Sequence, residues 1–272
     1  MNKSSFIIIT AISLIFIMIT MSFKFEKIFV SAFEKDVNKF LASIDAPEQG
    51  SIPISNRAEL EAIKNNLNGK YHMIKDIDLN GEEWEPINSF TGTFDGQGHV
   101  IHNLTITGDR EYSGLFDRIT NTAVVIKNVG LEGTDININR DSGNVYVGGI
   151  CGTNSASIYN CYNAGKVFAS APSSTTTSSN YAYAGGVCGN FSNGAISDCY
   201  NTGEIYASAF YARAGGICGQ NSNTTISIEN CYNNGNVSIS AIFSSGKYVG
   251  GVCGINAGGI ADIIGHADAR RS

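Results

Sequence analysis

The chain has 272 residues, of which 43% are hydrophobic and 15% charged, with 31 glycines, 4 prolines and a formal net charge of -6. This apolar content excludes an intrinsically disordered chain, and the acidic balance argues against binding to nucleic-acid phosphates. The glycines follow no Gly-x-y period, which excludes collagen, and their number indicates many turns.

Residues 1–32 have the features of an export signal. Lys3 precedes an uncharged run over 6–23, and the segment ends at Ala32 with small residues at its last and third-last positions, as at a signal-peptidase site. The run is also close to the shortest length that spans a bilayer, so an uncleaved membrane anchor is the alternative. Both readings predict an extracellular or cell-surface protein that contacts a membrane only through 6–23, and only when the segment is uncleaved.

Two short helical segments are expected next. Residues 33–55 mix charges with proline and glycine and predict a short helix followed by a linker. Residues 56–67 predict a clearer helix, because Asn56 can cap it and Glu59 stands three residues further on, as in a capping box. Its apolar residues recur at the spacing of one helical face. We expect this second helix to cap the fold.

From residue 70 onward the apolar period becomes that of strands. The segments 71–79, 99–106 and 123–131 alternate apolar and polar residues and are separated by glycine and asparagine turns. In the second segment His102 falls on the same face as Leu104, which predicts a core or turn position for it. Short strands without intervening helices fit a sandwich, a barrel or a parallel β-solenoid.

A repeat in the second half of the chain distinguishes between these folds. Each unit contains three apolar clusters, which are a Gly-Gly-[Ile/Val]-Cys run, an Ile-x-x-Cys-Tyr run and a third strand-like run. One unit cannot bury its apolar face alone, so the copies must stack, with one coil per unit and three strands per coil. The repeated structural positions are Cys151, Cys188, Cys218 and Cys253, then Cys161, Cys199 and Cys231, and the glycines Gly149, Gly186, Gly216 and Gly251.

The motif G-G-[IV]-C-G-x-N, followed by [IV]-x-x-C-Y-N-x-G-x-[IV], resembles the GLUG repeat. Such repeats occur in bacterial surface and secreted proteins, including some IgA-specific metalloendopeptidases. The resemblance covers about residues 54–260 and implies an all-β, right-handed parallel β-helix, a three-sided solenoid with a surface role. The expected organisation is a capping helix and first coils over 56–131, then GLUG-type repeats over 132–272. The last coil is expected to be unfinished, as in a truncated gene or a short family member.

The seven cysteines are predicted to be buried free thiols. An exported chain with this many cysteines ordinarily contains disulfides. Cysteines stacked at about 4.8 Å, however, have parallel Cβ vectors that fit the required torsion poorly. Bridges between some neighbouring cysteines are the alternative. No C-x-x-C motif and no histidine cluster is present, so neither a metal nor a cofactor is predicted.

No catalytic residue is predicted. Asp95 and His99 belong to a turn like those of pectin-degrading β-helix enzymes, but hydrolysis needs converging carboxylates, and the glycine-rich turn explains both residues. The segment 76–81 matches the start of a calcium loop, yet Ile87 stands where that loop requires glutamate. Residues 142–260 contain only six charged side chains, and no H-E-x-x-H motif is present. The chain is therefore predicted not to be an enzyme.

Asparagines and aromatic residues also recur at equivalent places. Repeated asparagines favour a structural role, since stacked side chains can hydrogen-bond along the axis and asparagine tolerates a left-handed backbone. Exposed aromatic residues can instead bind sugars or protein partners, with packing against the adjacent coil as the alternative. The candidate binding residues, all near the loops between coils, are Tyr181, Tyr183, Phe210, Tyr211, Phe243 and Tyr248.

These patterns favour a non-catalytic exported surface protein whose β-helix serves in adhesion. The predicted partners are host or bacterial surface glycans or proteins, and not nucleic acid. The alternatives are a carbohydrate-active β-helix enzyme and a fragment of a larger surface protein or peptidase.

Overall fold

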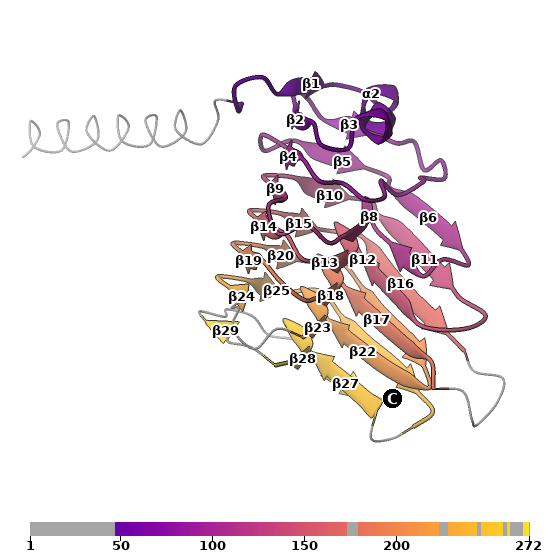
Figure 1. Cartoon of the computed structure of the whole chain (residues 1–272). Helices are drawn as coiled ribbons and strands as arrows, with labels where there is room; N and C mark the ends of the chain where they lie inside the picture. Colours follow the sequence, from indigo (N-terminus) through magenta and orange to yellow (C-terminus); the bar gives the residue numbers. More distant parts are fainter. Residues whose placement is uncertain are drawn as a thin grey trace, which may run out of the picture. The chain divides into compact units, whose positions relative to one another are not determined.

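The computed structural model describes residues 47–172, 179–222, 228–243 and 246–257, and the backbone of two strands near the C-terminus. The predicted export segment and linker residues 33–46 lie outside these described residues. Pro47–Ser272 is one compact unit, in which short parallel strands stack coil upon coil (Figure 1). Within the described residues, no helix combines the length and apolarity that crossing a membrane requires.

Five parallel sheets, here lettered A to E, run along the stack. Sheet A consists of β1 (Ile52–Ile54), β2 (Lys70–Met73), β4 (Thr93–Asp95), β9 (Val125–Lys127), β14 (Ser157–Tyr159), β19 (Ala195–Ser197), β24 (Ile228–Glu229) and β29 (Ile260–Ala261). Sheet B consists of β3 (Ile77–Asp78), β5 (Val100–His102), β10 (Gly130–Glu132), β15 (Tyr162–Asn163), β20 (Tyr200–Asn201) and β25 (Tyr232–Asn233).

The other three sheets complete each coil. Sheet C consists of β6 (Thr105–Gly108), β11 (Asp135–Asn139), β16 (Lys166–Ala171), β21 (Ile205–Ala209), β26 (Val237–Ala241) and β30 (Ala269–Arg271). Sheet D consists of β8 (Phe116–Ile119), β13 (Cys151–Asn154), β18 (Cys188–Phe191), β23 (Cys218–Asn221) and β28 (Cys253–Asn256). Sheet E consists of β7 (Tyr112–Ser113), β12 (Val145–Gly148), β17 (Tyr181–Gly185), β22 (Tyr211–Gly215) and β27 (Lys247–Gly250).

The predicted parallel β-helix is confirmed, but the predicted three strands per coil are wrong. A complete coil passes through sheets A, B, C, E and D in that order. The number rises from three to five because a corner divides two of the three apolar clusters. The Gly-Gly-[Ile/Val]-Cys run turns between β12 and β13, and the Ile-x-x-Cys-Tyr run turns between β14 and β15.

The corner between sheets A and B explains the repeated asparagines. Four residues at this corner adopt a left-handed backbone, with φ near +50°. Asparagine and aspartate accept this conformation more readily than most residues do. The side chains also stack, and Asn160 Nδ2 donates to Asn128 Oδ1 at 2.8 Å. The four corner residues are Asn128, Asn160, Asp198 and Asn230.

A left-handed residue places His102 beside a turn, one of its two predicted positions, and not in the core. Asn103 has φ of 58° and divides the segment 99–106 into β5 and β6. The alternation of faces therefore does not continue across it: Leu104 is buried, whereas His102 is half-exposed. His102 Nδ1 lies 3.7 Å from a carboxylate oxygen of Glu132 on the next coil.

The predicted capping helix is present but shorter than 56–67. It consists of α2 (Arg57–Glu61) and one 3-10 turn, η1 (Ala62–Asn65). The Glu59 amide donates to the side chain of Asn56 at 3.0 Å, and the Glu59 carboxylate accepts from the Ser55 amide instead of that of Asn56. This backbone hydrogen bond is the main reason that the pKa of Glu59 is lowered.

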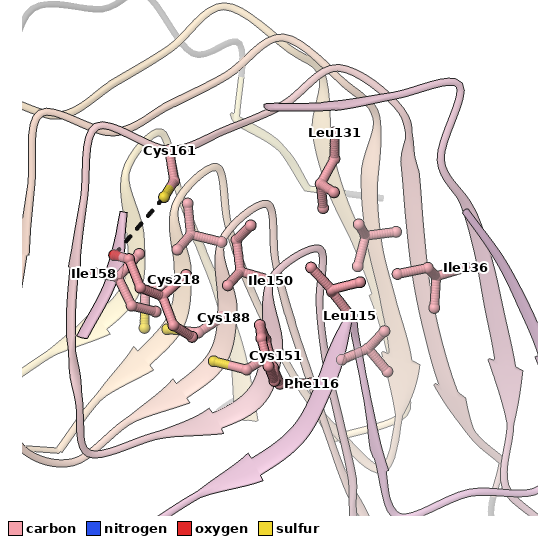
Figure 2. Packing of buried hydrophobic residues seen from close by; sticks show 14 of the residues in the cluster. Leu115, Phe116, Leu131, Ile136, Ile150, Cys151, Ile158, Cys161, Cys188 and Cys218 are labelled. Atoms are coloured by element: carbon pink, nitrogen blue, oxygen red, sulfur yellow. Dashed lines mark hydrogen bonds between the residues drawn. The ribbon is translucent and has the colours of Figure 1, made fainter. Parts of the chain in front are cut away.

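A column of asparagine side chains runs through the apolar interior. Asn163, Asn201 and Asn233 are almost fully buried and are joined head to tail, with Nδ2 to Oδ1 distances of 2.9 and 2.7 Å. Each side chain also donates to the carbonyl of the glycine two residues later. The rest of the core is apolar, and Figure 2 shows Leu115, Phe116 and Ile150 among its buried side chains. Buried amides are acceptable here because their hydrogen bonds are made.

Candidate functional site

The corner between sheets E and D is tight, and glycines make it possible. A Cβ at Gly148, which ends β12, would lie 2.3 Å from the carbonyl oxygen of Cys151 in sheet D. A Cβ at Gly152 in β13 would lie 2.7 Å from the carbonyl oxygen of Tyr146 in sheet E. Gly185 has an equally close contact on the next coil. The two sheets thus meet backbone to backbone along this line, here called the E–D corner.

A column of aromatic side chains lies on sheet E beside this corner. Tyr112, Tyr146 and Tyr183 pair in register, with ring centroids 5.2 and 4.6 Å apart and planes within 12°. Arg213 takes the equivalent place on the next coil, and Tyr248 follows it. The Arg213 guanidinium carbon lies 5.2 Å from the Tyr183 ring centroid and 5.8 Å from that of Tyr248.

A second aromatic group continues this surface. Tyr181 stacks on Tyr211 at 4.5 Å, and Phe210 stacks on Phe243 at 5.5 Å. Edge contacts between Tyr211 and both phenylalanines join the two pairs. The structure therefore brings the six candidate binding residues together on one surface, here called the aromatic surface. Its members are Tyr112, Tyr146, Tyr181, Tyr183, Phe210, Tyr211, Arg213, Phe243 and Tyr248.

Three members of this surface were missed from the sequence. Tyr112 and Tyr146 lie outside the aromatic-rich segments, and Arg213 follows Tyr211 in β22 but is not aromatic, so clustering of aromatic residues along the chain does not reveal them. Alignment of the strands before each Gly-Gly pair would have found two of them, because Tyr146 and Arg213 occupy the place of Tyr183 and Tyr248. This signal depends on the register between coils.

Stacking decides which parts of the aromatic surface a ligand can reach. Tyr183 is only 7% exposed, whereas Phe243 and Tyr248 are 43% and 41% exposed. Within the column each ring face covers the next, so ring edges and hydroxyl groups form its accessible part. Open ring faces are expected mainly at the coil that carries the two exposed residues.

Polar side chains of sheet D face the column across the E–D corner. Thr153, Asn190 and Gln220 pair in register on successive coils. Arg213 Nη1 donates to Gln220 Oε1, and also to the Tyr183 hydroxyl at 3.3 Å. These contacts hold the Arg213 side chain between the two sheets.

Three polar atoms near this corner lack a hydrogen-bond partner. They are Asp117 Oδ1, Thr153 Oγ1 and Arg213 Nε, each buried within the part of the chain that the structure describes. Burial raises the pKa of Asp117. Buried polar groups ordinarily have hydrogen-bond partners, so the corner contains polar atoms that could still form hydrogen bonds.

Asp95 and His99 do not converge on a catalytic site. Asp95 is 4% exposed, and its carboxylate pairs with Lys127 Nζ at 3.0 Å, Asn128 Nδ2 at 2.9 Å and the Gln97 amide at 3.0 Å. His99 Nδ1 instead lies 3.1 Å from Asp76 Oδ1. These contacts give Asp95 a structural role in its turn.

The carboxylates of the segment 76–81, which matches the start of a calcium loop, likewise form hydrogen bonds within the protein. Asp76 accepts from the Val100 amide at 2.9 Å, and Asp78 accepts from Asn103 Nδ2 at 2.8 Å. Over the described ranges, His, Cys, Asp and Glu side chains form no group of three that could hold a metal ion.

The cysteines form two columns. Cys151, Cys188, Cys218 and Cys253 pair directly in register on sheet D, and the other three follow the left-handed corner residues. All seven are free thiols, and all except Cys253 are buried. Figure 2 shows the Cys151 and Cys161 side chains within the core. Burial raises the pKa of Cys151 and Cys188.

We expect this burial to keep the thiols reduced, because the thiolate is the species that reacts. Titration of the purified protein in denaturant, without reductant, should find most of the seven thiols free. A count of one or fewer would contradict this expectation.

Comparison with known proteins agrees with the repeat. The family model of the GLUG motif matches residues 211–238. This segment is a GLUG motif. It makes one full passage around the stack, beginning at Tyr211 on sheet E and ending in β26 on sheet C. The GLUG motif therefore includes Arg213, Cys218 and Cys231.

Two similar proteins extend the comparison. Halomucin from Haloquadratum walsbyi is 32% identical over 134 residues, which is 42% of this chain and 1% of halomucin. The chain thus corresponds to a very small part of that relative. The crystal structure of a putative immunoglobulin A1 protease from Bacteroides ovatus has a TM-score of 0.55 and 20% identity, over 80% of this chain and 77% of that one. This likeness concerns the fold.

Proposed function

We propose that this chain is a non-catalytic, exported surface protein whose β-helix presents the aromatic surface for adhesion to glycans or proteins. The observation that carries the proposal is that one surface collects the six candidate aromatic residues together with Arg213. Aromatic and arginine side chains are those on which binding energy concentrates. The resemblance to GLUG repeats supports the surface location.

The same surface gives a direct test of adhesion. Phe243→Ala with Tyr248→Ala should weaken binding of the labelled full-length protein to epithelial or bacterial cells about 10-fold or more, because two exposed anchors are lost. Ile74→Ala is the matched control, since Ile74 is 54% exposed and lies between β2 and β3. Equal binding by all three proteins would contradict the proposal, as would failure of antibodies to label the protein on intact producing cells.

A second experiment addresses the non-catalytic part. The purified full-length protein should not cleave pectins, uronans or host glycans, because Asp95 is fully paired and the charged residues over 142–260 are few. Product formation can be followed by ultraviolet absorbance for lyase activity and by reducing ends for hydrolase activity. Turnover that disappears in Asp95→Ala would overturn this part of the proposal.

A further inference from the structure

We propose that the E–D corner around Arg213 binds a saccharide that carries a carboxylate group. This inference rests on the proposed function and specifies the ligand class of the same surface. It is drawn from the charge, the fixed geometry and the chemical character of the side chains around Arg213.

The first argument is a cation without a counter-ion. Arg213 makes no ion pair with a carboxylate among the residues that the structure describes. The three carboxylates within 142–260 lie elsewhere on the coils. Glu229 is in β24 on sheet A, Asp198 follows β19, and Glu204 precedes β21. In a chain with a net charge of -6, this isolated guanidinium is complementary to an anion.

The second argument is that Arg213 is already held in place. Its guanidinium carbon lies 4.9 Å from the Tyr181 ring centroid and 5.2 Å from that of Tyr183, and one terminal nitrogen donates to both Tyr183 and Gln220. Nε has no partner. A planar guanidinium donates through Nε and a terminal nitrogen to both oxygens of a carboxylate.

The third argument favours a saccharide over an acidic peptide. Arg213 donates to the Tyr183 hydroxyl and to the Gln220 amide, and hydrogen bonds continue from Gln220 through the Ser222 hydroxyl to the Asn190 amide. Such groups match the alternating donors and acceptors of sugar hydroxyls, with aromatic edges against the apolar parts of the ring. Strand addition would not place a peptide strand beside β22, which carries Arg213, because β22 is already paired with β17 on one side and β27 on the other.

The test uses the full-length protein and three oligosaccharide probes, which are oligogalacturonate, hyaluronate fragments and oligosialate. Isothermal titration calorimetry should detect binding of at least one probe. Methyl esterification of the carboxyl groups of that probe should raise Kd about 10-fold or more, because a charge-assisted contact becomes a neutral one. The absence of binding by all three probes would overturn the proposal.

Variants locate the contact. Arg213→Gln should raise Kd for the charged probe about 10-fold or more and leave Kd for its methyl ester nearly unchanged. Arg213→Lys should have an intermediate effect, since lysine keeps the positive charge but lacks the paired donors of the guanidinium group. Arg110→Gln is the matched control for net charge. Arg110 already pairs with both oxygens of the Glu85 carboxylate at 2.9 and 2.7 Å, so its loss should not change the affinity.

Two further measurements keep the outcomes distinct. Thermal unfolding must show that Arg213→Gln is folded under the titration conditions, and Arg213→Lys provides the comparison if it is not. Poly-glutamate should bind more weakly than the saccharide, and equal or tighter binding would overturn the ligand class. Adhesion that is lost with Phe243→Ala and Tyr248→Ala but is unaffected by Arg213→Gln would contradict this inference and leave the proposed function standing.

Discussion

Gly203→Ala is expected to abolish the cooperative folding of the repeats. A Cβ at Gly203 would lie 1.8 Å from the carbonyl oxygen of Gly165 on the preceding coil. That atom belongs to the backbone and cannot rotate away, and a Cβ at Gly235 on the following coil would lie equally close to the carbonyl oxygen of Gly203. The coils would have to separate locally, which we expect to lower the free energy of unfolding by more than about 4 kcal/mol. Urea denaturation followed by circular dichroism measures this loss.

Gly98→Ala is the control for this effect. Gly98 has φ of +80°, but no atom lies within 4 Å of a Cβ placed there. Its replacement should cost only about 1–2 kcal/mol, the energy of a left-handed backbone in a residue with a side chain. A Gly203→Ala protein as stable as Gly98→Ala would show that the coils can move apart easily.

Asn233→Ala is expected to have the second-largest effect. The substitution removes the acceptor for Asn201 Nδ2 and the donor to the Gly235 carbonyl. Both partners lie in the interior, where water cannot replace the lost amide. Each buried group left unpaired costs about 1–3 kcal/mol, so we expect a loss of about 3 kcal/mol or more. The change in the midpoint of chemical denaturation is the measurement.

The adjacent residue provides a matched control. Asn234 is exposed, and Asn234→Ala should change stability by less than about 0.5 kcal/mol. The two variants remove the same chemical group from neighbouring positions, so their difference isolates the buried column. A similar effect from both would contradict its structural role.

Much of the fold could be predicted because the repeat is explicit in the sequence. A unit that returns as Gly-Gly, cysteine and Cys-Tyr-Asn must place equivalent residues one above another, and this placement predicts the stack. The number of strands per coil could not be predicted. This number depends on the φ angle of corner residues such as Asn160. The sequence does not distinguish an asparagine that turns the chain from one, such as Asn163, that lies in a strand.

The candidate site could be predicted only in part, because sequence patterns reveal neighbours along the chain but not neighbours on adjacent coils. Phe210 and Tyr211, the second of which begins β22, are adjacent in sequence, and clustering finds them. Arg213 belongs to the site only because the register between coils places it between Tyr183 and Tyr248. Three-dimensional neighbours of this kind are separated by a whole coil of sequence.

By itself, the sequence determined the repeat, the parallel β-helix and the sparse distribution of charge that argues against catalysis. These follow from which residue types recur and at what spacing, since stacking copies is the way for such units to bury their apolar faces. Only the tertiary structure decided that two sheets meet at a glycine-lined corner and that Arg213 lies there without a carboxylate partner among the described residues. That outcome depends on backbone dihedral angles and on the register between coils, which no local pattern specifies.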